Sequence, residues 1–556
     1  MEDIRIGVFI CHCGTNIGGI LDIPCIREYV KTLPNVIYAT DTLYTCSEAG
    51  LSQIKEKIKD YNLNRVVVAS CTPRTHEPLF RSTCQEAGLN PYLFEMVNIR
   101  DQNSWVHMKE REKGTEKAKD LIRMGVSKAA LLQPLDKITV DVNPSALIIG
   151  GGIAGMNAAL NLANQGFQVV IIEKEPELGG NLKYVNQIFP TNENASKILE
   201  IRDRIKCHQN IVVYTSTVPV SVEGFIGNFE ITVKNNHNFE KINAGVIIVA
   251  TGAKVLTPKG LFGYNGKNII TQFELEQLLK NKDISAQNIV MIQCVGVRNG
   301  ERQYCSSICC MTALKNAMLI KKLNPDANIT ILYRDIQTHG THYEHYYRKT
   351  RENGIIFIKY LYEKPPIVKN RFVNVYNAFL NQDIDIPQDL VVLSSPLIAH
   401  DDSTILAKLL KIPQQEDKFF LEAHVKLRPA DFATDGIFIC GSARWPADIR
   451  DCISQAHAAA SRASRILSKE FLEVDGCTAE VNEDLCVGCN ICVKICPYNA
   501  ISKNEAGIAS VNKVLCKSCG LCGASCPENA ITIHHFTNEQ ILSIINSCRE
   551  EIANGV

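Results

Sequence analysis

Eight cysteines in two matching runs near the C-terminus constrain this chain more than any other feature. Each run has the spacing C-x2-C-x2-C-x3-C-P. The runs consist of Cys486, Cys489, Cys492 and Cys496, and of Cys516, Cys519, Cys522 and Cys526. Thiolates are soft ligands that suit iron–sulfur clusters, and the tight spacing lets one loop wrap a corner of a [4Fe–4S] cube. Zinc knuckles or disulfides are the alternative, but zinc closes on four ligands and leaves the doubled triplet unexplained.

The two runs resemble those of two-cluster bacterial-type ferredoxins. In that family the first three cysteines of a run bind one cluster and the fourth binds the other. The resemblance implies one cluster on Cys486, Cys489, Cys492 and Cys526, and a second on Cys516, Cys519, Cys522 and Cys496. A chain that contains this module is expected to transfer electrons.

The composition is that of a large protein without a dominant charge. The 556 residues suffice for several domains, and Lys+Arg and Asp+Glu both number 59, so nothing indicates a nucleic-acid or anionic-membrane partner. No apolar run reaches membrane-spanning length, and the acidic start is unlike a signal peptide. The 23 cysteines cluster in ligand-like spacings, which differs from a short secreted disulfide scaffold. We therefore expect a cytoplasmic protein of an anaerobic cell.

The order of apolar and amphipathic segments predicts an α/β chain in four parts. Strands are expected at Ile6–Ile10, Val36–Ala39 and Val66–Ala69, and a long helix at Glu112–Leu132. The four parts are an open α/β domain at 1–137, a larger α/β domain with nucleotide-binding signals at 138–472, an α+β ferredoxin domain at 473–535 and a C-terminal helix at 536–556. We expect the last helix to pack against the core of this chain.

A glycine turn at the start of the second part predicts a dinucleotide site. Gly150, Gly152 and Gly155 fit G-x-G-x-x-G. In this motif the first glycine makes a tight turn, the second lets the backbone approach a pyrophosphate, and the third allows close helix–strand packing. The next strand, Val169–Ile172, ends at Glu173, whose carboxylate is placed to bind a ribose hydroxyl. By itself the motif leaves FAD and NAD open.

Three further features resemble FAD-dependent pyridine-nucleotide-disulfide oxidoreductases such as thioredoxin reductases. They are Leu178-Gly179-Gly180, Ala250-Thr251-Gly252, and a late strand that ends in Cys440-Gly441-Ser442. The resemblance favours FAD and implies a double Rossmann domain. The residues expected to contact FAD are Gly150, Gly152, Ile153, Ala154, Gly155, Glu173, Lys174, Gly179, Gly180, Asn181, Ala250, Thr251, Gly252, Gly441, Ser442 and Ile449. Where that family has an aspartate that binds the ribityl chain, this chain has Ser442, so that contact is expected to differ.

The second Rossmann unit has lost its expected glycine loop. Between the strand at 288–293 and the helix at about 306–323, four cysteines stand where a nucleotide would lie: Cys294, Cys305, Cys309 and Cys310. The positive end of the helix dipole lowers thiol pKa values and favours an anionic cluster. We predict a [4Fe–4S] cluster on these four residues. A redox-active disulfide and a zinc site are the alternatives.

Three more cysteines follow the first strands of the N-terminal domain. Cys11, Cys46 and Cys71 lie where the carboxyl ends of parallel strands converge, and Cys13 is two residues beyond Cys11. The pattern suggests another metal site. The alternative is that these cysteines are buried and act as small hydrophobic residues.

With these pieces in place, the chain resembles the A-type subunits of heterodisulfide reductases over essentially its whole length. The markers are residues 8–19 (VFICHCGTNIGG), residues 69–78 (ASCTPRTHEP), residues 104–108 (SWVHM), and the 305–310 segment. The resemblance implies FAD, three [4Fe–4S] clusters and a fourth in the N-terminal domain. It also implies B- and C-type partner subunits, an electron donor of the hydrogenase, formate dehydrogenase or ferredoxin class, and a homodimer or a dimer with a paralogue.

Three departures from that family bear on function. Many members from methanogens insert a second ferredoxin module, and no such run stands between Gly180 and Gly252. A cysteine usually precedes the SWVH segment, where this chain has Asn103, so the N-terminal cluster would need Cys13, another residue or a partner as its fourth ligand. Electron-bifurcating members have a lysine where this chain has Ala447. Because a nearby charge tunes a flavin, bifurcation is in doubt.

The resulting hypothesis is an oxidoreductase subunit that passes electrons through FAD and [4Fe–4S] clusters. Its reaction is the reduction of the disulfide of coenzymes M and B in methanogenesis, or the reverse. One alternative is a component of a related complex, of the adenylylsulfate-reductase-linked or benzoyl-CoA-reductase type. Another is an electron wire or scaffold that has lost flavin activity, although the intact Gly150–Gly155 loop speaks against that loss.

Overall fold

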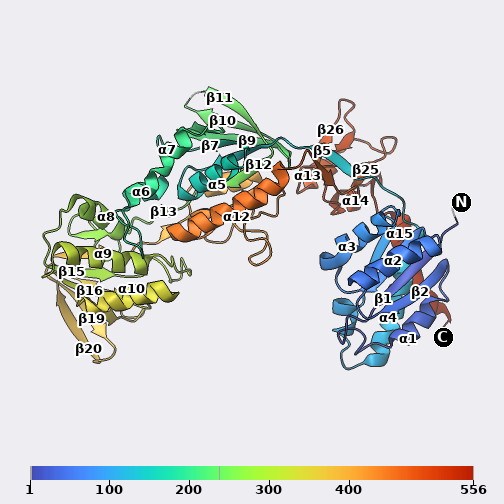
Figure 1. The fold of residues 1–556 in the computed structure, drawn as a ribbon, viewed down its shortest axis with the longest axis horizontal. Coiled ribbons are helices and arrows are strands. Elements are labelled where there is room, and N and C mark those ends of the chain that lie inside the picture. The colour runs from blue at the N-terminus through green and yellow to red at the C-terminus, as the bar shows by residue number, and fades with distance from the viewer. Residues whose placement is uncertain (1–2, 237, 555–556) are drawn as a thin grey trace. The chain divides into compact units, whose positions relative to one another are not determined.

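The computed structural model describes residues 3–236 and 238–554. The chain divides into two compact units, one of Met1–Thr139 with Glu473–Val556 and the other of Val140–Leu472 (Figure 1). The chain leaves the first unit within strand β5 (Ile138–Asp141) and returns to it within β24 (Phe471–Val474). The division into four parts made from the sequence stays a prediction.

The N-terminal part of the first unit is a parallel sheet with helices around it. The strand order is β2-β1-β3-β4. The strands are β1 (Ile6–Cys11), β2 (Val36–Thr42), β3 (Arg65–Ser70) and β4 (Phe94–Asn98), and the helices are α1 (Ile23–Val30), α2 (Glu48–Asp60), α3 (Pro73–Glu86) and α4 (Arg111–Ala130), with a π-helical turn η1 (Arg100–Ser104). β1 and β3 are buried along their whole length, as expected of strands covered on both faces. The predicted α/β class is confirmed here, while β4 and α3 have no counterpart in the sequence-based prediction.

The ferredoxin module and the last helix complete the first unit. The module contains two antiparallel ladders, β25 (Ala479–Val481) with β28 (Ile531–Ile533) and β26 (Ile501–Lys503) with β27 (Ala509–Val511), and two short helices, α13 (Ile491–Ile495) and α14 (Leu521–Ala524). The last helix, α15 (Asn538–Asn554), packs on α4. Arg123 of α4 donates its Nε hydrogen to the Ser547 carbonyl at 2.9 Å, so α15 joins the core of this unit as predicted.

The first lobe of the second unit is a five-stranded parallel sheet of order β23-β12-β6-β7-β8. Its strands are β6 (Ser145–Ile149), β7 (Gln168–Ile172), β8 (Ile211–Tyr214), β12 (Val246–Val249) and β23 (Ile437–Ile439). Helix α5 (Ile153–Asn164) packs against α12 (Ile449–Leu467), and small buried alanines of both helices allow the close approach. Shorter elements of this lobe are η2 (Gly180–Tyr184), α6 (Ala195–Leu199), α7 (Ile201–Lys206), α11 (Ser403–Leu410) and η3 (Gly441–Ala443), with an antiparallel sheet of β9 (Thr217–Phe225), β10 (Asn228–Asn235) and β11 (Asn238–Ala244).

The second lobe repeats the parallel-sheet plan in the order β14-β21-β15-β16-β17. Its strands are β14 (Ile269–Thr271), β15 (Asn288–Ile292), β16 (Asn328–Tyr333), β17 (Ile356–Lys359) and β21 (Leu390–Leu393), its helices are α8 (Gln272–Asn281), α9 (Cys309–Leu323) and α10 (Thr341–Glu352), and smaller ladders are formed by β13 (Lys254–Val255) with β22 (Leu397–Ile398) and by β18 (Ile367–Val368), β19 (Phe372–Asn377) and β20 (Gln382–Pro387). Helix α8 begins with a capping box in which Thr271 and Glu274 satisfy each other's backbone N–H groups. The predicted double Rossmann arrangement is therefore present.

Candidate functional site

A large cavity in the second unit is lined by almost every residue expected to contact FAD. Its volume is about 440 Å³, within the usual range for ligand pockets. The predicted residues that line it are Gly150, Gly152, Ile153, Ala154, Glu173, Lys174, Gly179, Gly180, Asn181, Ala250, Thr251, Gly252, Ser442 and Ile449. Of the remaining two, Gly155 supports the turn from behind and Gly441 precedes Ser442 on the loop after β23.

The glycine loop between β6 and α5 has the geometry that a phosphate cradle needs. Gly150 has φ +110°, a conformation that L side chains rarely adopt. A Cβ on Gly155 would lie 1.9 Å from the Gly150 carbonyl oxygen, so only glycine lets the helix approach the turn this closely. A Cβ on Gly152 would meet nothing within 4 Å. The helix therefore presents its N-terminus to open space, which suits an anionic pyrophosphate.

Polar groups along the cavity wall are held in place by backbone hydrogen bonds. The Glu173 carboxylate accepts the N–H of Gly151 at 2.7 Å and the N–H of Glu175 at 2.9 Å. A carboxylate has further lone pairs, so Glu173 retains capacity for a ribose hydroxyl. The Ser442 hydroxyl donates to the Ala447 carbonyl at 3.3 Å, which occupies its proton within its own turn. These contacts fit FAD, and the assignment of each residue stays a prediction.

The four cysteines of the second lobe converge on one pocket. Cys294 lies two residues after the end of β15, Cys309 and Cys310 are the first residues of α9, and Cys305 comes from the loop between them. The side chain of Gln293 lies in the wall, fully buried, and both of its amide atoms lack a hydrogen-bond partner among the described residues. Orphaned buried polar atoms indicate a missing partner. The pocket therefore fits an inorganic group bound by the four thiols.

The expectation of a lowered thiol pKa is wrong for Cys294, Cys309 and Cys310. Burial raises the pKa of Cys294, of Cys309 and, to about 12, of Cys310. Arg298 acts in the opposite direction on Cys294, with its Nη1 4.0 Å from the sulfur, but does not outweigh burial. The helix dipole falls off within the first turn and does not compensate for the loss of water around a thiolate. Ligand binding here must therefore release protons.

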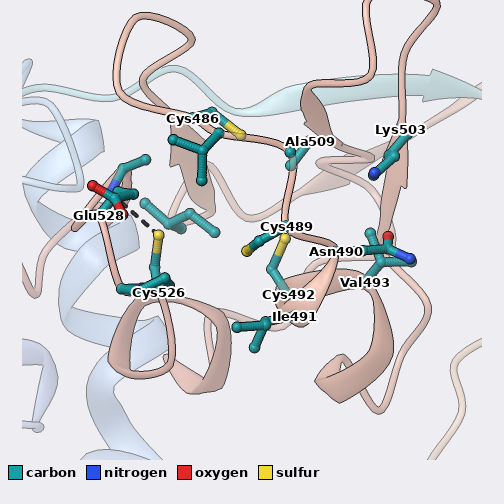
Figure 2. Close-up of a pocket in the computed structure, with 15 residues that line it drawn as sticks. Cys486, Cys489, Asn490, Ile491, Cys492, Val493, Lys503, Ala509, Cys526 and Glu528 are labelled. Carbon is teal, nitrogen blue, oxygen red and sulfur yellow. Dashed lines mark hydrogen bonds between the residues drawn. The ribbon is translucent and has the colours of Figure 1, made fainter.

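The two ferredoxin-type runs form two small cavities in the crossed arrangement. One is lined by Cys486, Cys489, Cys492 and Cys526, as Figure 2 shows, and the other by Cys496, Cys516, Cys519 and Cys522. The backbone N–H groups of Ala500 and Ala530 each point at the sulfur of the fourth cysteine of a run, at 3.3 Å. N–H groups aimed at sulfur stabilise the thiolate form and so suit cluster ligands. Each fourth cysteine thus lies in the cavity of the other run, as crossed ligation requires.

Two family models match parts of the chain. Residues 144–292 match a pyridine nucleotide-disulphide oxidoreductase, and residues 479–533 match a 4Fe-4S dicluster domain. The solved structure of T. acidophilum thioredoxin reductase is similar at 16% identity with a TM-score of 0.42, over 59% of this chain and 100% of that chain.

Curated relatives match nearly the full length. The chain is 38% identical to an A-type iron–sulfur subunit of CoB–CoM heterodisulfide reductase from Methanopyrus kandleri, over 91% of this chain and 92% of the relative. It is 37% identical to the A-type subunit of the H2:CoB–CoM heterodisulfide,ferredoxin reductase from Methanothermobacter thermautotrophicus, over 100% of this chain and 98% of the relative. The chain belongs to the family of A-type heterodisulfide reductase subunits.

Membership in this family confirms an FAD- and iron–sulfur-dependent oxidoreductase. Both cofactors supply electron transfer when they are bound. The alignment with the Methanothermobacter relative spans 652 residues, more than the 556 of this chain, so that relative contains sequence that this chain lacks. The number of clusters and the ligand of each iron stay predictions.

The N-terminal cysteines converge at one end of the four-stranded sheet. The N–H of Cys13 points at the Cys11 sulfur at 3.3 Å, and Arg100 places its Nη1 3.6 Å from the Cys13 sulfur. Burial raises the pKa values of Cys46 and Cys71, and proximity to Cys11 and Cys13 adds to the rise. All four thiols therefore share one region, with a guanidinium beside them.

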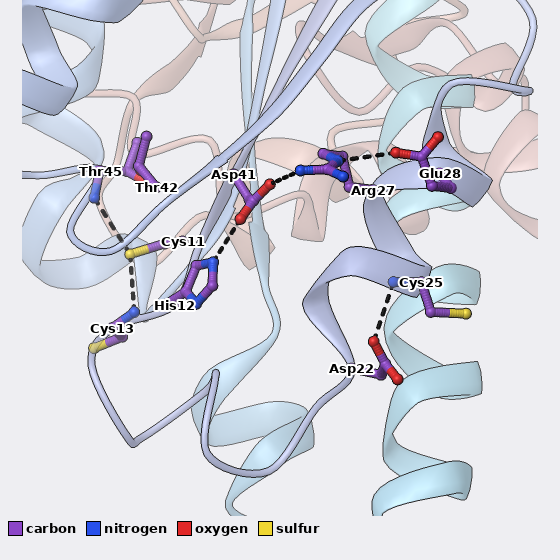
Figure 3. A network of polar contacts seen from close by, with 10 residues as sticks. All are labelled: Cys11, His12, Cys13, Asp22, Cys25, Arg27, Glu28, Asp41, Thr42 and Thr45. Carbon is purple, nitrogen blue, oxygen red and sulfur yellow. Dashed lines mark hydrogen bonds and ion pairs between the residues drawn. The ribbon is translucent and has the colours of Figure 1, made fainter.

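A charged network holds His12, which lies between Cys11 and Cys13 in the chain (Figure 3). His12 Nε2 lies 2.7 Å from Asp41 Oδ2, and Arg27 Nη1 donates to Asp41 Oδ1 at 2.8 Å. Burial acts to raise the pKa of Asp41, but these hydrogen bonds outweigh it and hold the pKa below its usual value. The ionised carboxylate thus orients His12, which separates the two cysteines.

Asn103 stands where the family usually has a cysteine, and the structure shows what its side chain does. Its amide donates to the Gly114 carbonyl at 2.8 Å, and its carbonyl oxygen is buried without a partner among the described residues. Asn103 therefore ties η1 to the start of α4. Cys13 as the source of a fourth N-terminal ligand stays a prediction.

Several groups at these sites left no signal in the sequence. Arg100 lies beside Cys13, from which it is 87 residues distant in the sequence, and a buried Lys315–Glu276 pair lines the FAD cavity.

Among the described residues, no helix combines the length and apolar character needed to cross a membrane. Within residues 3–236 and 238–554, no group of three or more His, Cys, Asp or Glu side chains is arranged so that it could hold a metal ion.

Proposed function

We propose that this chain is the flavin and iron–sulfur subunit of a cytoplasmic complex that reduces the disulfide of coenzymes M and B, or runs that reaction in reverse. The names of the relatives support this substrate, and one of them names ferredoxin as well. Partners of the B and C type would hold the disulfide site. A hydrogenase, a formate dehydrogenase or ferredoxin would supply electrons, and a second copy or a paralogue would complete a dimer.

One observation carries the proposal most strongly. Cys309 lines both the FAD cavity and the pocket of the four second-lobe cysteines. Its sulfur lies 3.6 Å from the Ser395 carbonyl oxygen, and Ser395 is also a wall residue of the FAD cavity. The Ser307 hydroxyl donates to the Pro446 carbonyl at 3.3 Å and ties the cysteine loop to the segment before α12. Cys309 would therefore form part of the wall of both proposed cofactor sites.

The segment at Ala447 supports electron transfer without bifurcation. Ala447 lines the FAD cavity with a methyl group, at the position where the resemblance implies a lysine in bifurcating members. Its neighbour Asp448 caps α12 by accepting the N–H of Asp451 at 2.8 Å, and the Tyr343 hydroxyl donates to the same residue. This wall presents no ammonium at that point, so we propose that the electron pair leaves in one direction.

The N-terminal site would hold a further [4Fe–4S] cluster on Cys11, Cys13, Cys46 and Cys71. The support is the convergence of the four thiols and the guanidinium of Arg100, which would offset the negative charge of a thiolate-bound cluster. With the pocket of the second lobe and the two ferredoxin-type sites, the chain would contain four clusters.

The test is anaerobic purification of the native complex with its partners. We expect one FAD per chain, iron and acid-labile sulfide for four clusters, and reduction of the heterodisulfide by the assembled complex. Ferredoxin reduced in step with the disulfide would show that the chain bifurcates after all. A colourless preparation without iron, sulfide or flavin would refute the proposal as a whole.

A further inference from the structure

A buried ion pair lies in the wall of the FAD cavity. Lys315 of α9 and Glu276 of α8 form the pair, and their side chains are 2% and 3% exposed. The ammonium also donates to the Gln187 carbonyl at 2.8 Å, and the second carboxylate oxygen accepts the N–H of Asn186 at 3.0 Å. Both side chains line the same cavity as the glycine loop.

Such a pair needs a reason to be where it is. The cost of removing two charges from water often exceeds their mutual attraction, and apolar residues of similar size usually do as well or better. Apolar residues lie beside the pair, since Leu314 and Ala317 of α9 belong to the fully buried core of this lobe. Fold stability alone therefore does not explain a lysine and a glutamate at this place.

The ammonium also has unused capacity. A lysine side chain has three N–H donors, and Lys315 directs two of them to Glu276 and to the Gln187 carbonyl among the described residues. Ser395 is another wall residue, and its buried hydroxyl has no hydrogen-bond partner among the described residues. Both groups are thus able to bond to a molecule in the cavity.

The position of the pair along the cavity follows from the proposed FAD site, on which this inference rests. The glycine loop and Glu173 mark the end that takes the pyrophosphate and the ribose. The rest of the dinucleotide would occupy the remaining part of the cavity, to whose wall α8 and α9 both contribute. Lys315 comes six residues after Cys309 on α9, about 9 Å along the helix axis at 1.5 Å per residue.

We propose that the Lys315–Glu276 pair sets the reduction potential of the bound flavin. Reduction adds two electrons and one proton to the ring system, so the flavin gains one negative charge. The Lys315 ammonium stabilises that charge and favours the reduced form. The Glu276 carboxylate opposes the same charge and limits the effect. Lys315 acts on the flavin through its charge and takes no part in a bond change. Together with Glu276 it forms a fixed dipole in the cavity wall.

The test measures the flavin potential of the full-length holoprotein by anaerobic spectroelectrochemistry. Glu276→Gln leaves the ammonium without its counter-charge, so we expect the potential to rise. Lys315→Met leaves the carboxylate alone, so we expect it to fall. Each shift should change the ratio of reduced to oxidised flavin at least tenfold at a fixed applied potential, which is about 30 mV for a two-electron couple. The double variant K315M/E276Q should return toward the wild-type value.

A matched pair in the first unit provides the control. Lys128 and Glu95 are 2.9 Å apart, and the lysine side chain is 8% exposed, but neither residue lines the FAD cavity. Lys128→Met and Glu95→Gln should lower thermal stability and leave the flavin potential unchanged. If Glu276→Gln and Lys315→Met retain FAD but shift the potential in the same direction, or not at all, the inference is wrong. If the wild-type protein holds no FAD, the proposed function fails instead.

Discussion

Gly152 offers a direct test of where FAD binds. It is the residue before α5, with φ −75° and ψ −175°, a conformation that alanine adopts without strain. A Cβ at this position would meet no protein atom within 4 Å and would project into the cavity that Gly152 lines. Gly152→Ala should therefore leave the fold intact and place a methyl group where the pyrophosphate must approach. Overpacking of this kind costs about 1–3 kcal/mol, which corresponds to a loss of FAD affinity of about 5- to 150-fold.

The assay is a titration of the apoprotein with FAD, followed by flavin fluorescence under anaerobic conditions. Gly300→Ala is the control, because a Cβ at Gly300 also meets nothing within 4 Å and the residue does not line the cavity. We expect both variants to melt within a few degrees of the wild type, and only Gly152→Ala to lose affinity. Unchanged FAD binding by a well-folded Gly152→Ala variant would show that the cofactor lies elsewhere.

Three further variants probe the other sites. Cys526→Ala should remove the cluster bound with the first three cysteines of the first run and leave the second ferredoxin-type cluster intact. EPR of the reduced protein should then lose one of two ferredoxin-type signals, and loss of neither would contradict crossed ligation. Cys13→Ala should remove four irons per chain if Cys13 is the fourth N-terminal ligand, and an unchanged iron content would mean that it is not. Burial lowers the pKa of His535 to about 4. Below a pH of about 6.5 the imidazole is therefore protonated in the unfolded state but stays neutral in the folded state. Stability is full above that pH and should fall by about 3 kcal/mol as the pH drops toward 4; His535→Phe should flatten this dependence in calorimetry, and an equal slope for both proteins would refute the assignment.

The sites that the sequence predicts are those built from local spacing. The ferredoxin cysteines lie within eleven residues in each run, and the structure brings each set of four to one cavity. The second-lobe cysteines span seventeen residues, from Cys294 to Cys310, and they too meet in one pocket. In each case a strand end or a helix start fixes where the loop must lie, so spacing along the chain is enough to indicate the site.

The groups that sequence did not predict depend on packing between distant segments. Arg100 reaches Cys13 because β4 and β1 end at the same edge of the sheet, and Glu276 meets Lys315 because α8 packs on α9. The error about the Cys309 and Cys310 pKa values has the same origin. The helix dipole can be predicted from the sequence, whereas the burial that outweighs it depends on the β22 region and on the segment around Asp335, which only the fold brings together.

Helix α9 shows how one change of loop could alter the chemistry of a Rossmann lobe. A glycine loop at its start would hold a nicotinamide dinucleotide, which exchanges electrons with a flavin as one hydride, two electrons at a time. In this chain the start of α9 presents Cys309 and Cys310, and Cys309 also forms part of the cavity wall. An iron–sulfur cluster accepts one electron at a time, so the same helix position would divide the pair that FAD releases. Farther along the helix, Lys315 lines the same cavity. The ammonium that we propose favours flavin reduction and two of the thiols that would hold the electron-accepting cluster are thus on one helix, and a change in α9 should affect both.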